Sequence, residues 1–168
     1  MGIFDFVKDA GKKILGQDDE PQPKAAPSAP QRGVADVHAE RNRRLGGEIV
    51  RFIQGLDLPV EDLAVRVDGD TAHVKGKVPT QDDREKVILA AGNVRGIARV
   101  DDKVEVTGGA GGESTMYTVE SGDTLSKIAK QHYGDANAYH RIFEANRPLL
   151  KDPDEIYPGQ VLRIPPKS

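Results

Sequence analysis

The chain has 168 residues, a net charge of -3 and no cysteine. This length accommodates one or two small domains, and the lack of cysteine excludes disulfides and thiolate metal sites. The slightly acidic balance gives no global reason to expect binding to nucleic acid. The four histidines do not have the spacing of a metal site, and no apolar run approaches the length of a membrane span.

The first residues predict a short amphipathic helix and argue against a secretion signal. Apolar side chains recur at near-helical spacing over residues 1–16, with charged residues between them. Asp5, Lys8 and Asp9 interrupt the apolar run that a signal peptide needs, so we expect a cytoplasmic protein. Because a helix of about a dozen residues is marginal by itself in water, we expect it to dock on its own chain rather than on a membrane.

Two segments of unusual composition divide the chain. Residues 17–33 contain four prolines among Ala, Gln and Ser, which is typical of a semi-rigid linker. Residues 108–114 are rich in glycine and predict a flexible joint. The sequence therefore predicts an N-terminal helix over residues 1–16, one domain over residues 34–107 and a second domain over residues 115–168.

The first half of the first domain reads as a helix followed by a β-hairpin. An apolar face over residues 34–58 predicts a helix that Pro59 ends. Apolar and polar residues alternate over residues 63–67 and 72–78, on either side of a turn at residues 68–70. This pattern, with a glycine in the turn, is typical of two antiparallel strands.

A second helix and a third strand complete the predicted domain. Thr80 is a suitable N-cap, with Asp83 three residues later as in a capping box. Residues 97–106 predict a strand, which we expect to bend at Asp101 and Asp102. Calcium loops use several closely spaced carboxylates, whereas adjacent residues of a strand point to opposite faces. We therefore interpret the two aspartates as a solvated bend.

The junction between the second helix and the third strand is the most informative stretch. Gly92 and Gly96 flank a short turn there, and glycine just past a helix lets the chain reverse without steric penalty. The last carbonyls of a helix lack intrahelical partners and carry the negative end of its dipole. Two interpretations stay open from the residues alone. The glycines either cap the helix and turn the chain, or they let a cation approach main-chain oxygens.

Several short patterns in the first domain are similar to those of BON domains. They are Val67-Asp68-Gly69, Val74-x-Gly76-x-Val78 and Val94-x-Gly96-Ile97-x-x-Val100-x-x-x-Val104. The resemblance implies an α+β domain with the element order αββαβ.

The second domain resembles a LysM domain. The patterns that carry the resemblance are Tyr117-Thr118-Val119, Gly122-Asp123-Thr124-Leu125, Ile128-Ala129, Ala145-Asn146 and Ile156-Tyr157-Pro158-Gly159-Gln160-x-Leu162-x-Ile164-Pro165. Such domains have the order βααβ. The resemblance also implies a groove for glycans that contain N-acetylglucosamine. Its residues here would be Gly122, Asp123, Thr124, Leu125 and Ile156.

The pairing of these two domains behind a short N-terminal segment resembles a family of bacterial cytoplasmic potassium-binding proteins. The resemblance implies that main-chain oxygens of the N-terminal segment and of the glycine turn hold K⁺, whose hydration shell carbonyls can replace. The implied ligands are Val7, Lys8, Ala10, Ala90, Gly92, Val94 and Ile97. It further implies a sensor or buffer of K⁺ in which binding of the ion compacts the two domains.

Glycan binding and catalysis are two other classes of function. Glycan binding through the LysM half is the alternative, although a protein without an export signal would not meet peptidoglycan. Catalysis is not expected, because no Ser/His/Asp constellation, phosphate loop or pair of acids in a cleft can be recognised. We therefore expect a monomeric, two-domain α+β protein that binds potassium, with no nucleic-acid partner and no integral membrane contact.

Overall fold

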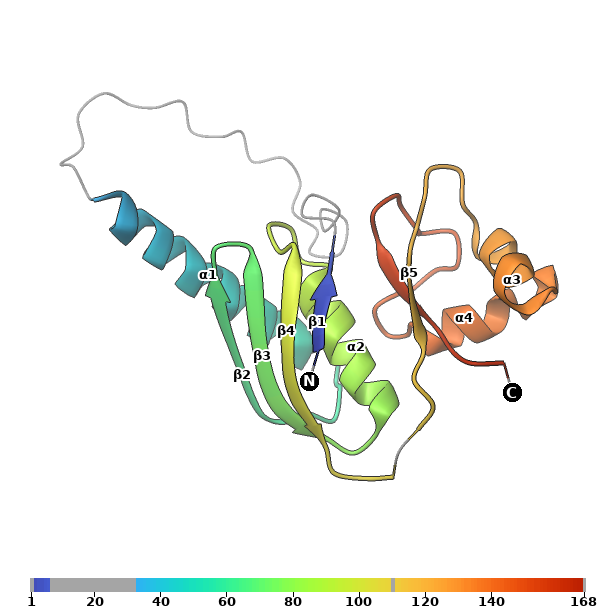
Figure 1. The fold of residues 1–168 in the computed structure, drawn as a ribbon, viewed down its shortest axis with the longest axis horizontal. Helices are drawn as coiled ribbons and strands as arrows, with labels where there is room; N and C mark the ends of the chain where they lie inside the picture. Colours follow the sequence, from blue (N-terminus) through green and yellow to red (C-terminus); the bar gives the residue numbers. More distant parts are fainter. Residues whose placement is uncertain (1, 7–32, 110, 168) are drawn as a thin grey trace.

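The computed structural model describes residues 2–6, 33–109 and 111–167 (Figure 1). It shows an α+β protein with a four-stranded sheet of order β1-β4-β3-β2 and a two-stranded sheet of β5 and β6. No helix within the described ranges is long and apolar enough to span a bilayer.

The first domain has the predicted order αββαβ. Its elements are α1 (Val34–Gly55), β2 (Glu61–Asp68), β3 (Thr71–Val78), α2 (Gln81–Gly92) and β4 (Arg99–Val106). The hairpin of β2 and β3 is antiparallel and turns at Gly69, whose φ of 61° favours glycine. Strand β4 then lies parallel to β3, with α2 as the crossover between them. The side chain of Thr80 accepts a hydrogen bond from the backbone N–H of Asp83, which confirms the predicted cap.

The core lies between the inner face of the four-stranded sheet and the two helices. Alternate residues of β3 and β4 are buried, because successive side chains of a strand point to opposite faces. The core side chains from these four elements include Ile49, Ile53, Ala72, Val74, Val78, Val87, Ile88, Val100 and Val104. Helix α2 lies on the side of the sheet that faces the second domain (Figure 1).

The predicted bend at Asp101 and Asp102 is wrong. Strand β4 runs without interruption beside β3, from the pair Thr71 and Arg99 to the pair Val78 and Val106. The side chain of Asp102 is fully buried, and it pairs with the guanidinium of Arg84 at 2.6 Å. A buried carboxylate is costly unless it is paired, so the cation on α2 allows an aspartate at an inward position of the strand.

The predicted N-terminal helix is wrong for its first residues. Gly2–Asp5 form the strand β1, which pairs antiparallel with β4 at the edge of the sheet. The segment does dock on its own chain, as expected. Side chains alternate from exposed Ile3 to buried Phe6, a period of two that fits a strand. Residues 7–16, the rest of the predicted helix, lie outside the described residues.

The second domain has the predicted order βααβ. Its elements are β5 (Thr115–Thr118), α3 (Leu125–Tyr133), the 3₁₀ turn η2 (Ala136–Ala138), α4 (Tyr139–Ala145) and β6 (Val161–Ile164). Gly134 ends α3 with a φ of 79°, a left-handed conformation that glycine adopts without penalty. Leu125, Ile128, Ile142 and Leu162 are among the residues of its separate core.

Candidate functional site

The candidate turn follows directly from the end of α2. Four of the predicted ligand residues, Ala90, Gly92, Val94 and Ile97, lie on this stretch and are buried. The last helical bond runs from the N–H of Asn93 to the carbonyl of Leu89, at 3.0 Å. The structure thus brings these four predicted residues together. Val7, Lys8 and Ala10, the other three, lie outside the described residues.

Several carbonyl oxygens of this turn accept no backbone hydrogen bond from the described loops and turns. Among the described residues, no backbone bond outside the helix and strand ladders ends on the oxygen of Ala90, Gly92 or Ile97. The oxygen of Val94 accepts the N–H of Ile97 at 3.1 Å, which leaves it one lone pair. Buried carbonyls usually have partners, so these oxygens are candidates for another ligand.

The N-terminal strand leads to a residue, Phe6, that contacts the end of α2 just before this turn. The ring of Phe6 lies directly against Gly92, so that a β-carbon at position 92 would overlap the ring. The N–H of Phe6 donates to the carbonyl of Ala98 at 2.6 Å. The expectation that Gly92 lies past the helix and reverses the chain is wrong, because Gly92 is the last residue of α2 and its φ is not left-handed. Its role is to leave room for the ring of Phe6. The predicted ligands Val7 and Lys8 follow Phe6 in the sequence.

The far side of the turn is tied to the β-hairpin. Gly96 has a φ of 94°, which confirms the need for glycine there. The N–H groups of Ala98 and Arg99 both donate to the carbonyl of Asp70 in the hairpin loop, at 2.7 and 3.2 Å. The turn is thus fixed at both ends, by Phe6 on one side and by the hairpin loop on the other.

The side chain of Asn93 connects the turn to the second domain. Its amide nitrogen donates to the carbonyl of Val161 at 3.0 Å, and its amide oxygen accepts the N–H of Val161 at 3.0 Å. Asn93 is only 4% exposed. Sequence reasoning missed this role, since an asparagine after a helix is expected in the turn itself.

An ion-pair cluster joins the two domains a short distance away. Arg163 of β6 is 1% exposed and donates to the carboxylates of Glu85 at 2.9 Å and of Asp82 at 2.5 Å, both on α2. It also donates to the hydroxyl of Ser114 at 3.0 Å. The sequence held a signal that was overlooked, because Arg163 is the one charged residue in the apolar strand Val161–Ile164. A buried arginine requires such partners.

The acidic residues of the described chain do not form a cluster for a metal ion. Within the described ranges, no group of three or more His, Asp or Glu side chains is arranged to hold one. Asp101 instead accepts a hydrogen bond from His73 at 2.8 Å and pairs with Lys103 at 3.3 Å. The bond from His73, with a further contribution from Lys103, lowers the pKa of Asp101 below its ordinary value of 3.8.

The residues implied for the glycan groove come from the turn into α3, except Ile156, which lies between α4 and β6, and most of them have structural roles. Asp123 accepts from the hydroxyl of Tyr117 at 2.8 Å, and this bond raises the pKa of Tyr117 to about 12. Thr124 caps α3, and Leu125 is buried in the core. The carbonyl of Gly122 accepts from the ammonium of Lys127 at 2.7 Å. Ile156 is half-buried and packs against the same core.

Comparison with known families identifies both domains. The family model described as "BON domain" matches residues 48–108, and the one described as "LysM domain" matches residues 117–165. These ranges include the α2 turn and strand β6 respectively.

Comparison with whole proteins is more specific. The chain is 42% identical to the potassium binding protein Kbp of Escherichia coli, over 98% of this chain and 99% of the relative. It is 33% identical to an uncharacterized protein of Deinococcus radiodurans, over 83% of this chain and 58% of the relative. A 50% identity to an esterase of Mycobacterium tuberculosis spans only 30% of this chain and 10% of that enzyme. The chain therefore belongs to the family of the potassium binding protein Kbp.

Proposed function

We propose that this protein binds K⁺ through main-chain oxygens at the turn after α2. The ligands in this proposal are Ala90, Gly92, Val94 and Ile97 of the turn, with Val7, Lys8 and Ala10 of the N-terminal segment. The observation that carries the proposal is the contact of Phe6 with Gly92. The start of the N-terminal segment thus lies near a turn where, among the described residues, the oxygens of Gly92 and Ile97 accept no backbone hydrogen bond outside the helices and strands, which supports the proposal.

The chemistry of this turn suits a large monovalent cation. K⁺ sheds its hydration shell readily when several carbonyl dipoles replace it. The end of a helix adds a partial negative charge without an ionised side chain. The name of the E. coli relative, which is similar over nearly the whole chain, agrees with the choice of ion. We therefore propose binding of potassium rather than catalysis as the activity of this chain.

Binding of the ion would also affect the second domain. Asn93 lies directly after Gly92 and pairs with Val161 of β6, so a change in the turn reaches the domain interface through one side chain. A ligand shifts such an equilibrium only by its difference in affinity for the two states. We propose that K⁺ favours the docked, compact arrangement. A role as a monomeric, cytoplasmic sensor or buffer of K⁺ is part of this proposal.

Titration calorimetry of the full chain with KCl tests the proposed function, with NaCl and choline chloride as controls for ionic strength. We expect saturable heat with K⁺ only, and its loss when Phe6→Ala removes the ring that anchors the segment to Gly92. Ile3→Ala on the same strand is the matched control, because Ile3 is 70% exposed on the outer face. Equal heats with KCl and NaCl would count against the proposal.

The alternative, glycan binding by the second domain, has its own support in the match of residues 117–165 to the LysM family model. Gly122 of the implied groove is exposed in a turn with a φ of 85°, so its backbone is accessible. A pull-down of the full chain with purified peptidoglycan tests this alternative. Retention that soluble N-acetylglucosamine oligomers abolish would support it.

A further inference from the structure

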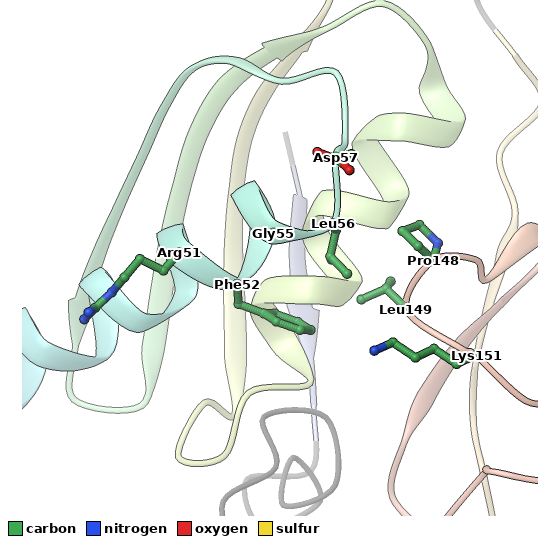
Figure 2. Close-up of a pocket in the computed structure, with 8 residues that line it drawn as sticks. All are labelled: Arg51, Phe52, Gly55, Leu56, Asp57, Pro148, Leu149 and Lys151. Atoms are coloured by element: carbon green, nitrogen blue, oxygen red, sulfur yellow. The ribbon is translucent and has the colours of Figure 1, made fainter.

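A cleft lies between the two domains, away from the turn after α2 (Figure 2). Its volume is about 430 Å³, which lies within the usual range of small-molecule sites. The lining residues come from the end of α1 and from the loop after α4, and are Arg51, Phe52, Gly55, Leu56, Asp57, Pro148, Leu149 and Lys151. Both domains thus contribute to one site, and ligands bind preferentially at such interfaces.

The cleft has an apolar wall and a cationic side chain that reaches into it. Phe52 and Leu56 of the first domain face Leu149 of the second (Figure 2). The side chain of Lys151 extends across the opening toward Phe52, whereas that of Arg51 points away (Figure 2). Among the described residues Lys151 has no ion-pair partner, and it is exposed. Its ammonium group is therefore available to an anion.

The end of α1 adds a second unusual feature. Asp57 lies at the opposite end of the cleft from Lys151 and has a φ of 53°, a left-handed conformation that residues other than glycine seldom adopt (Figure 2). A β-carbon at Gly55 would meet no atom within 4 Å, so the backbone forms part of the cleft wall.

We propose that this cleft binds a small amphipathic organic anion, such as a medium-chain carboxylate. The carboxylate would pair with the ammonium of Lys151, and the hydrocarbon would lie against Phe52, Leu56 and Leu149. Burial of the apolar chain supplies most of the affinity, because it removes hydrocarbon surface from water. The single exposed ion pair sets the orientation and adds less. This proposal uses none of the proposed K⁺ ligands, but it requires the docked arrangement of the two domains.

Calorimetry of the full chain with decanoate, below its micellar concentration, tests the proposal. We expect saturable binding of one decanoate for each chain. Gly55→Leu should abolish it, because the new side chain fills the cleft without meeting a neighbour. Gly47→Leu on the same helix is the control, since Gly47 does not line the cleft. Lys151→Glu should weaken binding roughly fivefold, and Lys167→Glu, with the same change in charge outside the cleft, should not.

Amide chemical shifts give a second readout that does not depend on heat. Decanoate should shift the amides of residues 51–57 and 148–151, and circular dichroism should show that the variants remain folded. Binding that Gly55→Leu leaves unchanged, shifts confined to residues 122–125, or a signal that never saturates would each overturn the proposal. The titration is run both in KCl and in NaCl, because both domains line the cleft and the proposed function has K⁺ favour their docked arrangement. Absence of decanoate binding in both salts would overturn this proposal and would leave the binding of K⁺ untouched.

Discussion

The side-chain amide of Asn93 pairs with both main-chain polar groups of Val161, across the interface of the two domains. Two residues further along β6, the amide of Asn146 pairs in the same way with the N–H and carbonyl of Arg163. Strand β6 bonds to β5 on its other edge. Two asparagines therefore take the place of a missing strand, one from each domain, and protect an edge that would otherwise be open.

Replacing Asn93 by alanine should weaken the docking of the two domains. Val161 is 4% exposed, so the variant leaves a buried N–H and a buried carbonyl without partners. Each such group costs about 1–3 kcal/mol. We expect urea unfolding to show a loss of about 2–4 kcal/mol, and small-angle scattering to show a larger radius of gyration.

Asn137→Ala is the control for this experiment, because Asn137 is exposed on η2. It should change neither the stability nor the radius of gyration. If Asn93→Ala has the scattering curve of the unmodified chain at every salt concentration, the amide pair does not hold the domains together.

The ion pair of Arg163 and Glu85 should be strongly coupled. Both side chains are nearly fully buried, at 2% and 4% exposed. Removing Arg163 leaves Glu85 as a buried charge without a cation, which costs about 3–5 kcal/mol, whereas an apolar pair of similar volume is often neutral. We expect Arg163→Met alone to be severe and Glu85→Leu alone to cost less, because Arg163 keeps its pair with Asp82. The double variant should recover much of the loss. Additive effects in the double-mutant cycle would contradict a direct interaction.

Gly92→Ala separates the packing role of this glycine from its effect on helix propensity. Alanine within a helix normally stabilises it by about 0.5–1 kcal/mol relative to glycine. Here the added methyl group overlaps the ring of Phe6, so we expect a net loss of stability. Hydrogen exchange should become faster at the amide of Phe6, which donates to Ala98.

Gly47→Ala on α1 is the matched control for that substitution. The nearest atom to its new methyl group is the end of the flexible Arg51 side chain, at 3.7 Å. It should raise the stability by about 0.5–1 kcal/mol, the usual gain for alanine in a helix, and should leave the exchange of the Phe6 amide unchanged. If the Phe6 amide is protected from exchange equally in Gly92→Ala and in Gly47→Ala, the position of the Phe6 ring does not depend on glycine at position 92.

Asp101 should contribute stability at neutral pH that disappears in acid. Its folded pKa is lower than 3.8 because of the hydrogen bond from His73, so the folded state favours the carboxylate. The stabilising contribution of Asp101 is therefore complete at pH values above 3.8, the ordinary pKa, and is lost as the pH falls through the lower folded pKa. We expect Asp101→Asn to lower the urea midpoint near neutral pH and to match the unmodified chain in strong acid.

Asp5→Asn on the neighbouring strand is the comparison for this pH series. Asp5 pairs with Arg99 at 3.5 Å but is 85% exposed, and such pairs contribute little. A constant difference between Asp101→Asn and the unmodified chain at all pH values would rule out a contribution from ionisation.

The sequence patterns predicted most of the architecture. Alternation of apolar residues and the glycine turn identified the hairpin of β2 and β3, and Thr80 identified the start of α2. The N-terminal strand was misread because its apolar residues, Ile3, Phe4 and Phe6, are too few to separate a period of two from a helical one. Pairing with the edge of β4 decided the outcome, which is a tertiary effect.

The interface could not be predicted from local patterns. Asn93 and Val161 are 68 positions apart, and Glu85 and Arg163 are 78 apart. The docking of the two domains decides which residues pair, and the spacing of apolar residues along the sequence carries no information about that docking. The sequence did place the reversal at Gly96, whose φ is 94°, because glycine leaves a local signal where a chain reverses. It misassigned Gly92, which is the last residue of α2 and not a turn residue. It could not reveal that the ring of Phe6 occupies the space beside Gly92.

Crystals grown with Tl⁺ in place of K⁺ test the central claim most directly, because Tl⁺ has a similar size and a strong anomalous signal. Our account predicts one peak beside Gly92, surrounded by main-chain oxygens of the turn and of the N-terminal segment. An excess of K⁺ should remove the peak. Strong density only at surface carboxylates, or none near Gly92 in a well-ordered crystal, would contradict the account.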